Sequence, residues 1–358
     1  MSRKRICMVG AGRVGRLHTG NLSRRVGDRA EVTAICDPGG SVAQALADDF
    51  GVGAVYPSLA AALGEQAFDA VVITTPTFTH RDEAVLALEA GLDVHLEKPM
   101  AMNLAECRDI SAAAATSGRV VQLGFMRRFD ADFVAAADLL ASGDVGQPMI
   151  IKSLTHGPGL PPAWANDIRT SNGMLAEVNS HDLDTVGWFA RSEPVDISVR
   201  TANFKGAGRG ATAPHFYDTL VATITFASGA LAVVTGVCPA DYGYDSRVEV
   251  IATSGLLQVG DTGPGGLTSV TAGTGESRRK LYVSWRDRFA EAYATEMIEL
   301  VAAMDGGPVR VGVEEGTQAV ALVVAGTRSL LEGRTVALSE VSADDGVPSW
   351  QQREVVGA

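Results

Sequence analysis

The feature that most constrains this chain is a glycine-rich turn close to its beginning. The apolar run Arg5–Val9 leads directly into Gly10-Ala11-Gly12-Arg13-Val14-Gly15, and a stretch of helical periodicity follows. In such a strand–turn–helix unit the first glycine permits a tight turn, the second lets the backbone approach a pyrophosphate, and the third lets the helix pack closely on the strand. The pattern therefore predicts a Rossmann-type unit that binds a dinucleotide.

An acidic residue stands where this kind of site needs one. The next apolar run, Glu31–Cys36, ends at Asp37, whose carboxylate can accept hydrogen bonds from both hydroxyls of a ribose. A carboxylate here would repel a 2′-phosphate, and no arginine follows it in Pro38-Gly39-Gly40-Ser41. We therefore expect NAD rather than NADP, with the phosphates at the helix N-terminus. The expected cofactor contacts are Gly10, Gly12, Arg13, Val14, Gly15 and Asp37.

The first third of the chain continues the alternation of short apolar strands and amphipathic helices that is typical of a doubly wound parallel sheet. The predicted strands are Arg5–Val9, Glu31–Cys36, Ala70–Thr74, Asp93–Leu96 and Val120–Gly124. The predicted helices between them are His18–Val26, Ser41–Phe50, His80–Ala90 and Leu104–Ser117. With 358 residues the chain is long enough for two domains, and we expect an NAD-binding Rossmann domain over residues 1–124.

The remainder, residues 125–358, has a different pattern and is expected to form an α+β substrate domain with a large, mainly antiparallel open sheet, because its strands follow one another without intervening helices. Its predicted strands are Met149–Leu154, Ser198–Asn203, Thr219–Phe226, Leu231–Gly236, Arg247–Ala252 and Lys280–Ser284. Two late helices, Phe289–Met304 and Glu315–Leu331, are expected to pack on that sheet or back against the first domain. The segment Gly260–Gly275 is expected to be a hairpin or exposed loop.

Charge and composition exclude several classes of partner. The formal net charge of −12 has the wrong sign for binding nucleic acid or an anionic membrane surface. No apolar run is long enough to cross a membrane, and the N-terminus shows no cleavage pattern, so a cytoplasmic location is expected. The four cysteines are scattered without metal-ligand spacing, so they are interpreted as structural thiols and no metal site is predicted.

Two further motifs carry a resemblance to a known family. Thr75-Pro76-Thr77-Phe78-Thr79-His80 follows one predicted strand, and Glu97-Lys98-Pro99 follows the next. Together with the glycine turn they resemble the signature of the Gfo/Idh/MocA family of sugar and cyclitol oxidoreductases. The resemblance implies cofactor contacts from Thr75, Pro76, His80, Glu97 and Lys98. It also implies that the open sheet forms a substrate wall and often an oligomer interface, so a homodimer or homotetramer is expected.

The chemistry of a ring dehydrogenase needs a group that takes the hydroxyl proton as hydride leaves the same carbon. His181 is the candidate, and Glu177, four residues earlier in a stretch interpreted as helical, would share its face and fix the imidazole. A buried histidine with an ordinary surface pair is the alternative, and the family pattern favours catalysis, although that family commonly has Asp at the Glu177 position. Lys98, at the carboxyl end of a parallel strand, would hold the substrate oxygen.

The substrate is predicted from softer signals. Gly124-Phe125-Met126-Arg127-Arg128-Phe129-Asp130 and Tyr242-Gly243-Tyr244-Asp245 resemble segments of family members that act on inositols. Arg127, His156 and Tyr242 are therefore candidate substrate contacts, together with Lys98, Glu177 and His181, although Gly157-Pro158 departs from the His-Arg-Asn pattern of those members. We predict oxidation of a ring hydroxyl of myo- or scyllo-inositol. A pyranose dehydrogenase and a non-catalytic NAD-binding sensor are the alternatives.

Overall fold

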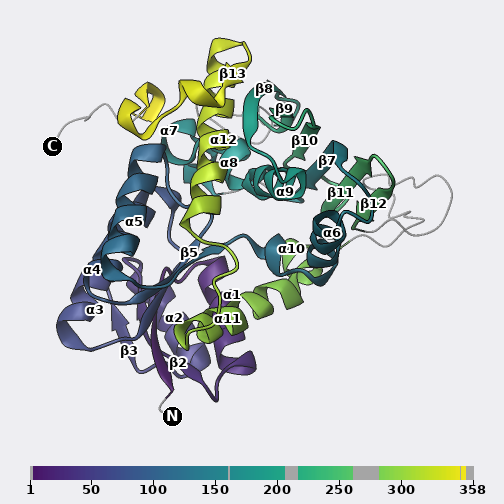
Figure 1. Cartoon of the computed structure of the whole chain (residues 1–358). Coiled ribbons are helices and arrows are strands. Elements are labelled where there is room, and N and C mark those ends of the chain that lie inside the picture. Colours follow the sequence, from purple (N-terminus) through teal and green to yellow (C-terminus); the bar gives the residue numbers. More distant parts are fainter. Residues whose placement is uncertain (1–2, 160–161, 206–216, 261–281, 347, 352–358) are drawn as a thin grey trace. The chain divides into compact units, whose positions relative to one another are not determined.

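The computed structural model describes residues 3–159, 162–205, 217–260, 282–346 and 348–351, and the chain divides into two compact units (Figure 1). Unit 1 comprises residues 1–129 and 291–317, and unit 2 comprises residues 130–290 and 318–358. Residues 291–317, which the sequence placed in the second domain, thus group with the first unit. Across the described residues no helix is long and apolar enough to cross a membrane.

Unit 1 contains a six-stranded parallel sheet in the order β3-β2-β1-β4-β5-β6. Its strands are β1 (Lys4–Val9), β2 (Ala30–Cys36), β3 (Ala54–Tyr56), β4 (Ala70–Ile73), β5 (Asp93–Glu97) and β6 (Val121–Gly124). The strand order reverses between β1 and β4, which is the switch point where such sheets bind ligands. The expected doubly wound fold is confirmed. The short strand β3 was not predicted.

Helices cover both faces of this sheet. They are α1 (Arg13–Arg25), α2 (Gly40–Phe50), α3 (Leu59–Glu65), α4 (His80–Glu89), α5 (Leu104–Ser117) and α11 (Ala290–Met304). One core cluster joins Ile6 and Met8 of β1 to Leu22 of α1, Leu46 of α2 and Leu300 of α11. The late helix α11 therefore completes the cover of one face, while α3, α4 and α5 lie side by side in the second layer (Figure 1).

Unit 2 contains a seven-stranded sheet in the order β12-β11-β7-β10-β9-β8-β13, in which only the β7–β10 pairing is parallel. Its strands are β7 (Pro148–His156), β8 (Pro194–Ala202), β9 (Thr219–Phe226), β10 (Leu231–Val237), β11 (Asp245–Ala252), β12 (Leu256–Val259) and β13 (Val336–Ala337). The mainly antiparallel sheet that the sequence predicted is confirmed. Burial alternates along β9, so one face is covered and the other is open.

The helices of unit 2 are α6 (Ala131–Ser142), α7 (Ile168–Ser171), α8 (Gly173–Glu177), α9 (Ser180–Ala190), α10 (Trp285–Arg288) and most of α12 (Val313–Glu332). Helix α12 packs closely on α8 and β8, because a Cβ on Gly326 would lie 2.6 Å from Leu175 of α8 and 3.2 Å from Ile197 of β8. Ser329 of the same helix accepts a hydrogen bond from the Val199 amide at 3.0 Å.

Two local predictions were wrong. The stretch 177–184 is not one helix, because α8 ends at Glu177 and α9 begins only at Ser180. The amides of Val178 and Asn179 both bond to the carbonyl of Met174, which closes α8 before a new helix starts. Of the predicted strand Lys280–Ser284, the described residues 282–284 form a single bridge, between Tyr282 and Tyr244, before α10 begins. Residues 280–281 of that predicted strand and residues 261–275 of the predicted loop Gly260–Gly275 lie outside the described residues.

Candidate functional site

The glycine turn of unit 1 separates into two kinds of glycine. Gly10 has a φ of +100°, and a Cβ on Gly15 would lie 2.0 Å from the Gly10 carbonyl oxygen, so both positions require glycine for the fold itself. A Cβ on Gly12 would meet nothing within 4 Å. The fold thus gives no reason for Gly12 to lack a side chain, and the space beside it is available to a ligand.

The first turn of α1 offers backbone donors to that space. Gly12 is its N-cap and makes no side-chain capping bond, and no acidic residue lies in the first turn. Helix N-terminal amides without such partners bind phosphate well, because their N–H groups and the helix dipole both favour negative charge. Arg13 is exposed and Val14 is half-buried beside them. A pyrophosphate fits the donors present.

Asp37 lies at the end of β2 and ties this turn to the next loop. Its carboxylate accepts hydrogen bonds from the Ala11 amide at 2.8 Å and from the Gly39 amide at 2.7 Å. A carboxylate has about four acceptor positions, so two remain for the hydroxyls of a ribose. Asp37 is half-buried, and this arrangement matches the acidic residue of a dinucleotide site.

The loops after β4 and β5 are held together by His80. Its Nδ1 lies 2.8 Å from the Pro99 carbonyl oxygen and its Nε2 lies 3.0 Å from the Thr75 carbonyl oxygen. Burial lowers the pKa of His80 despite these contacts. A neutral imidazole carries one N–H, so it donates to one of these two carbonyl oxygens, and the ring lies between the loop of Thr75 and Pro76 and the segment Glu97-Lys98-Pro99 at one edge of the sheet. The roles of His80, Thr75 and Pro76 toward a cofactor stay predictions.

Lys98 follows the last residue of β5 and is half-buried, and the Lys98–Pro99 peptide bond is cis. The side chain of Glu97 turns away from that edge into the core, where its Oε1 lies 2.8 Å from His18 Nε2. Its other oxygen accepts the Lys98 amide at 3.2 Å. The carboxylate of Glu97 thus makes its contacts inside unit 1. The predicted cofactor contact of Glu97 stays a prediction.

In unit 2, His181 is the second residue of α9 and is 7% exposed. The residue after it, Asp182, is fully buried and accepts hydrogen bonds from Ser153 of β7 at 2.6 Å and from Asn179 at 2.8 Å. Asn179 also contacts the Thr235 carbonyl of β10 at 3.3 Å. These bonds fix the first turn of α9 on the sheet, and with it the backbone of His181.

The same unit brings two substrate candidates together. His156, the last residue of β7, bonds through Nδ1 to the hydroxyl of Tyr242, and its Nε2 lies 3.3 Å from the Thr235 hydroxyl. Burial lowers the pKa of His156, and burial raises the pKa of Tyr242 to about 12. Both groups are therefore uncharged near neutral pH, and they offer hydrogen-bonding groups suited to hydroxyls rather than to ions.

The two remaining candidates stay predictions. Arg127 lies in a short 3-10 helix over Met126–Phe129 and is 1% exposed. Glu177 is half-buried at the end of α8, so its assignment as partner of His181 rests on the family motif and no longer on helical spacing.

Sequence reasoning missed three buried polar residues, which are Asp182, His18 and Glu296. Asp182 lies three residues after Asn179, the N-cap residue of α9, and an asparagine of this kind is a signal for a helix start. His18 and Glu296 lie in ordinary amphipathic helices, and only the fold places them beside Glu97.

An open parallel sheet with a glycine turn at its switch point and an acidic residue ending the second strand defines a dinucleotide-binding protein. Residues 4–125 match the profile of an oxidoreductase family with an NAD-binding Rossmann fold, and residues 133–258 match the GFO/IDH/MocA C-terminal domain. The chain belongs to the Gfo/Idh/MocA oxidoreductase family, and NAD is its cofactor.

Relatives match the chain over almost its whole length. Inositol 2-dehydrogenase 3 of Saccharopolyspora erythraea is 30% identical and aligns with 94% of this chain and 95% of its own. The scyllo-inositol 2-dehydrogenase (NAD(+)) of Bacillus subtilis is 29% identical over 96% of this chain and 98% of its own. The crystal structure of myo-inositol dehydrogenase from Lactobacillus casei in complex with NAD(H) and myo-inositol has a TM-score of 0.80 at 26% identity, covering 98% of this chain and 100% of that one.

Proposed function

We propose that this protein is an NAD-dependent dehydrogenase that oxidises a ring secondary hydroxyl of a cyclitol, myo- or scyllo-inositol, to the ketone. The observation that carries the proposal is that relatives named for inositol align across both units, so the likeness includes the substrate half as well as the cofactor half. The uncharged His156–Tyr242 pair supports a substrate that presents hydroxyls.

The proposal assigns a separate role to each catalytic residue. NAD bound beside the glycine turn would supply the acceptor for the hydride that leaves the substrate carbon bearing the hydroxyl. Lys98, at the carboxyl end of β5, hydrogen-bonds the substrate oxygen and stabilises the negative charge that develops on it. His181 takes the hydroxyl proton at an imidazole nitrogen, and Glu177 orients that imidazole. Arg127, His156 and Tyr242 hold the other hydroxyls.

The experiment is a turnover assay that follows reduced nicotinamide with NAD and, separately, NADP against inositol isomers, hexoses and a nucleotide sugar. We expect turnover of at least one inositol with NAD. Activity on a pyranose alone would show that the substrate is a sugar and not a cyclitol. NAD binding without any turnover would favour a non-catalytic sensor over an enzyme. Lys98→Met and His181→Ala are each expected to lower kcat, measured at saturating NAD, by at least about 10²-fold, the usual contribution of a general base, and the Kd for NAD is expected to be unchanged in His181→Ala. Full turnover in either variant would contradict its role.

We also propose that the protein is a homodimer or homotetramer that associates through the open face of the unit 2 sheet. Ile150 of β7 and Leu231 of β10 lie directly opposite each other in the register and are 36% and 50% exposed. Val221 of β9, opposite Thr235 on the same face, is 43% exposed. Apolar side chains gathered on one face favour association. Light scattering measures the mass of the assembly directly. Leu231→Glu is expected to weaken the assembly because it places a charge on this face, and a parent protein with the mass of a monomer would contradict the proposal.

A further inference from the structure

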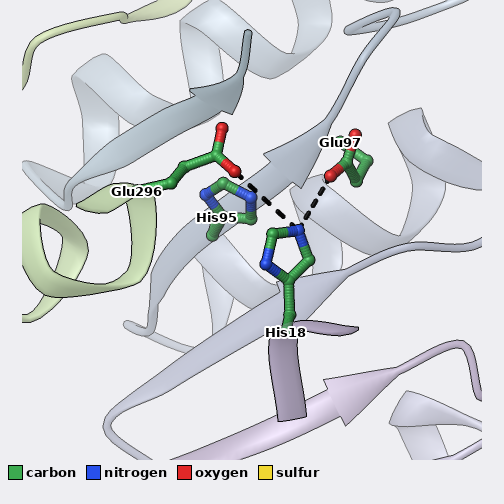
Figure 2. Close-up of side chains that lie close together, drawn as sticks. All are labelled: His18, His95, Glu97 and Glu296. Atoms are coloured by element: carbon green, nitrogen blue, oxygen red, sulfur yellow. Dashed lines mark hydrogen bonds and ion pairs between the residues drawn. The ribbon is translucent and has the colours of Figure 1, made fainter. Parts of the chain in front are cut away.

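Unit 1 contains a cluster of four titratable side chains in its interior. They are His18 of α1, His95 and Glu97 of β5, and Glu296 of α11, with exposed fractions of 0%, 0%, 7% and 0%. Their ligand-type atoms lie within 4.8 Å of one another, and Figure 2 shows the side chains pointing toward a common centre. Ionisable groups are rarely buried this completely unless they are paired, so the cluster requires a physical explanation.

Glu97 is the ionised member. It accepts hydrogen bonds from His18 Nε2 at 2.8 Å and from the Lys98 amide at 3.2 Å. A Cβ on Gly124 would lie 2.9 Å from its carboxyl carbon, so the glycine makes the room that the carboxylate occupies. Burial acts to raise the pKa of Glu97, but the His18 hydrogen bond and the electrostatic effect of neighbouring groups, Lys98 among them, outweigh it, and the pKa is lowered.

Glu296 is in the opposite state. Within the described part of the chain neither of its carboxyl oxygens has a hydrogen-bond partner, and the closest approach of His18 Nε2 to it is 4.0 Å. Burial and the negative charge of Glu97 both raise the pKa of Glu296 well above its ordinary value. Two adjacent buried carboxyl groups titrate apart in this way, one holding a proton that the other gives up.

The two histidines complete the assignment. His18 Nε2 faces a carboxylate oxygen, so that nitrogen carries a proton and donates. His95 Nδ1 lies 3.3 Å from the side-chain amide of Gln122, and burial lowers the pKa of His95 to about 3, which keeps its ring neutral. The 2.8 Å separation of His18 and Glu97 is that of a direct hydrogen bond. Two ligands of one tetrahedral zinc ion, each about 2.0–2.1 Å from the metal, would lie about 3.3 Å apart.

We propose that His18, Glu97 and Glu296 form a buried proton-sharing cluster, with His95 neutral beside it, and that Glu97 is the positioning residue for Lys98. The ionised Glu97 carboxylate holds the Lys98 amide, while protonation of Glu296 removes the second negative charge that would otherwise oppose that ionisation. This role rests on the proposed function of Lys98 in substrate oxidation. The protonation states do not depend on that function.

The protonation states are tested by infrared difference spectroscopy of the full-length protein at neutral pH. A carbonyl band of a protonated carboxyl group is expected in the parent protein and in E97Q, and it should be absent from E296Q. E89Q, at an exposed carboxylate, is the matched control and should keep the band. His18→Leu removes the donor that keeps Glu97 ionised, so a second band should appear. The proposal would be overturned if the parent protein shows no carbonyl band that is lost in E296Q. It would also be overturned if the purified parent protein contains one equivalent of metal and E296Q does not.

The positioning role is tested by the exchange of the Lys98 amide hydrogen and by kinetics. In E97Q the acceptor is neutral, and we expect faster exchange at Lys98, whose neighbour Pro99 has no amide hydrogen to confuse the signal. We also expect kcat, measured at saturating NAD, to fall by about 10- to 100-fold, the usual loss when a group that orients a functional side chain is changed. Unchanged exchange and unchanged kcat would overturn the role. If no inositol is turned over, the proposed function fails. The infrared spectra and the amide exchange still test the protonation states of the cluster and the contact between Glu97 and Lys98.

Discussion

Replacing Gly12 with alanine separates what the fold needs from what the cofactor needs. A Cβ at this position would meet nothing within 4 Å, and the φ of −71° and ψ of −166° are open to any residue. Alanine is a poorer N-cap than glycine, but it also reduces the entropy of the unfolded chain, and each effect is about 0.4–1 kcal/mol in opposite directions. The free energy of unfolding of Gly12→Ala without cofactor should therefore stay within about 1 kcal/mol of the parent value.

The cofactor should respond very differently. The methyl group would occupy the space in which the pyrophosphate approaches the first turn of α1, and one hydrogen bond to a charged group contributes about 1.5–3 kcal/mol. Loss of that bond corresponds to about a ten- to hundredfold increase in the Kd for NAD. The assays are titration calorimetry with NAD and thermal unfolding with and without NAD, since bound cofactor raises the midpoint only in a protein that binds it.

Two other glycines serve as controls for Gly12→Ala. Gly15→Ala would place its methyl 2.0 Å from the Gly10 carbonyl oxygen and should destabilise the protein by about 3 kcal/mol or more. Gly64→Ala, at an exposed position of α3 with nothing within 4 Å, should be neutral or slightly stabilising and should leave NAD binding unchanged. The reasoning is refuted if Gly12→Ala binds NAD as tightly as the parent protein, or if it unfolds as readily as Gly15→Ala.

Three further predictions follow from single contacts. Asp37→Ser combined with an arginine in the following loop should shift preference toward NADP, and unchanged selectivity in kcat/KM would contradict the ribose contact. The Arg334 hydrogen bond lowers the pKa of Glu340 from 4.5 to about 2, so the stabilisation from this pair is complete above pH 4.5 and is lost as the pH falls toward 2. The free energies of unfolding of Glu340→Gln and of the parent protein should therefore converge over that window. A difference that stays constant with pH would exclude the pair as its cause. Gly236→Ala would place a methyl 2.1 Å from Asn179 Oδ1 and should destabilise the protein by about 1–3 kcal/mol in urea, whereas full stability would show that Asn179 moves freely.

Most strands of the unit 1 sheet could be predicted from the sequence because they are buried on both faces and appear as apolar runs. β4 consists of Ala-Val-Val-Ile and is buried at all four positions, whereas β5 is buried at all five although Asp93, His95 and Glu97 are polar. β3, with only Ala54–Tyr56, is half-buried and too short to give a pattern. The break at Val178–Asn179 lay hidden within a run of helix-compatible residues, although Asn179 and Ser180 are both residues that favour helix starts.

The position of α11 could not be predicted from its own residues. Its apolar periodicity predicts a buried face without saying which unit covers it, and the sequence left both possibilities open. The structure buries Met297, Leu300 and Val301 with Ile6 and Met8 of β1. The choice depends on the shape of the surface that α1, β1 and α2 present, and this shape exists only after the sheet has formed.

The motif Glu97-Lys98-Pro99 shows what a sequence signature leaves undecided. The motif predicts that its members matter, but it does not distinguish residues that serve the fold from residues that face the ligand. In the structure Glu97 turns inward to His18, and the Pro99 carbonyl oxygen is taken by His80. Lys98 lies between these two residues and is half-buried, and its amide donates to Glu97. Since both flanking residues are fixed by interior contacts, the lysine is the member of the motif best placed for chemistry at the sheet edge. The position of its backbone depends on the contacts of Glu97 and Pro99.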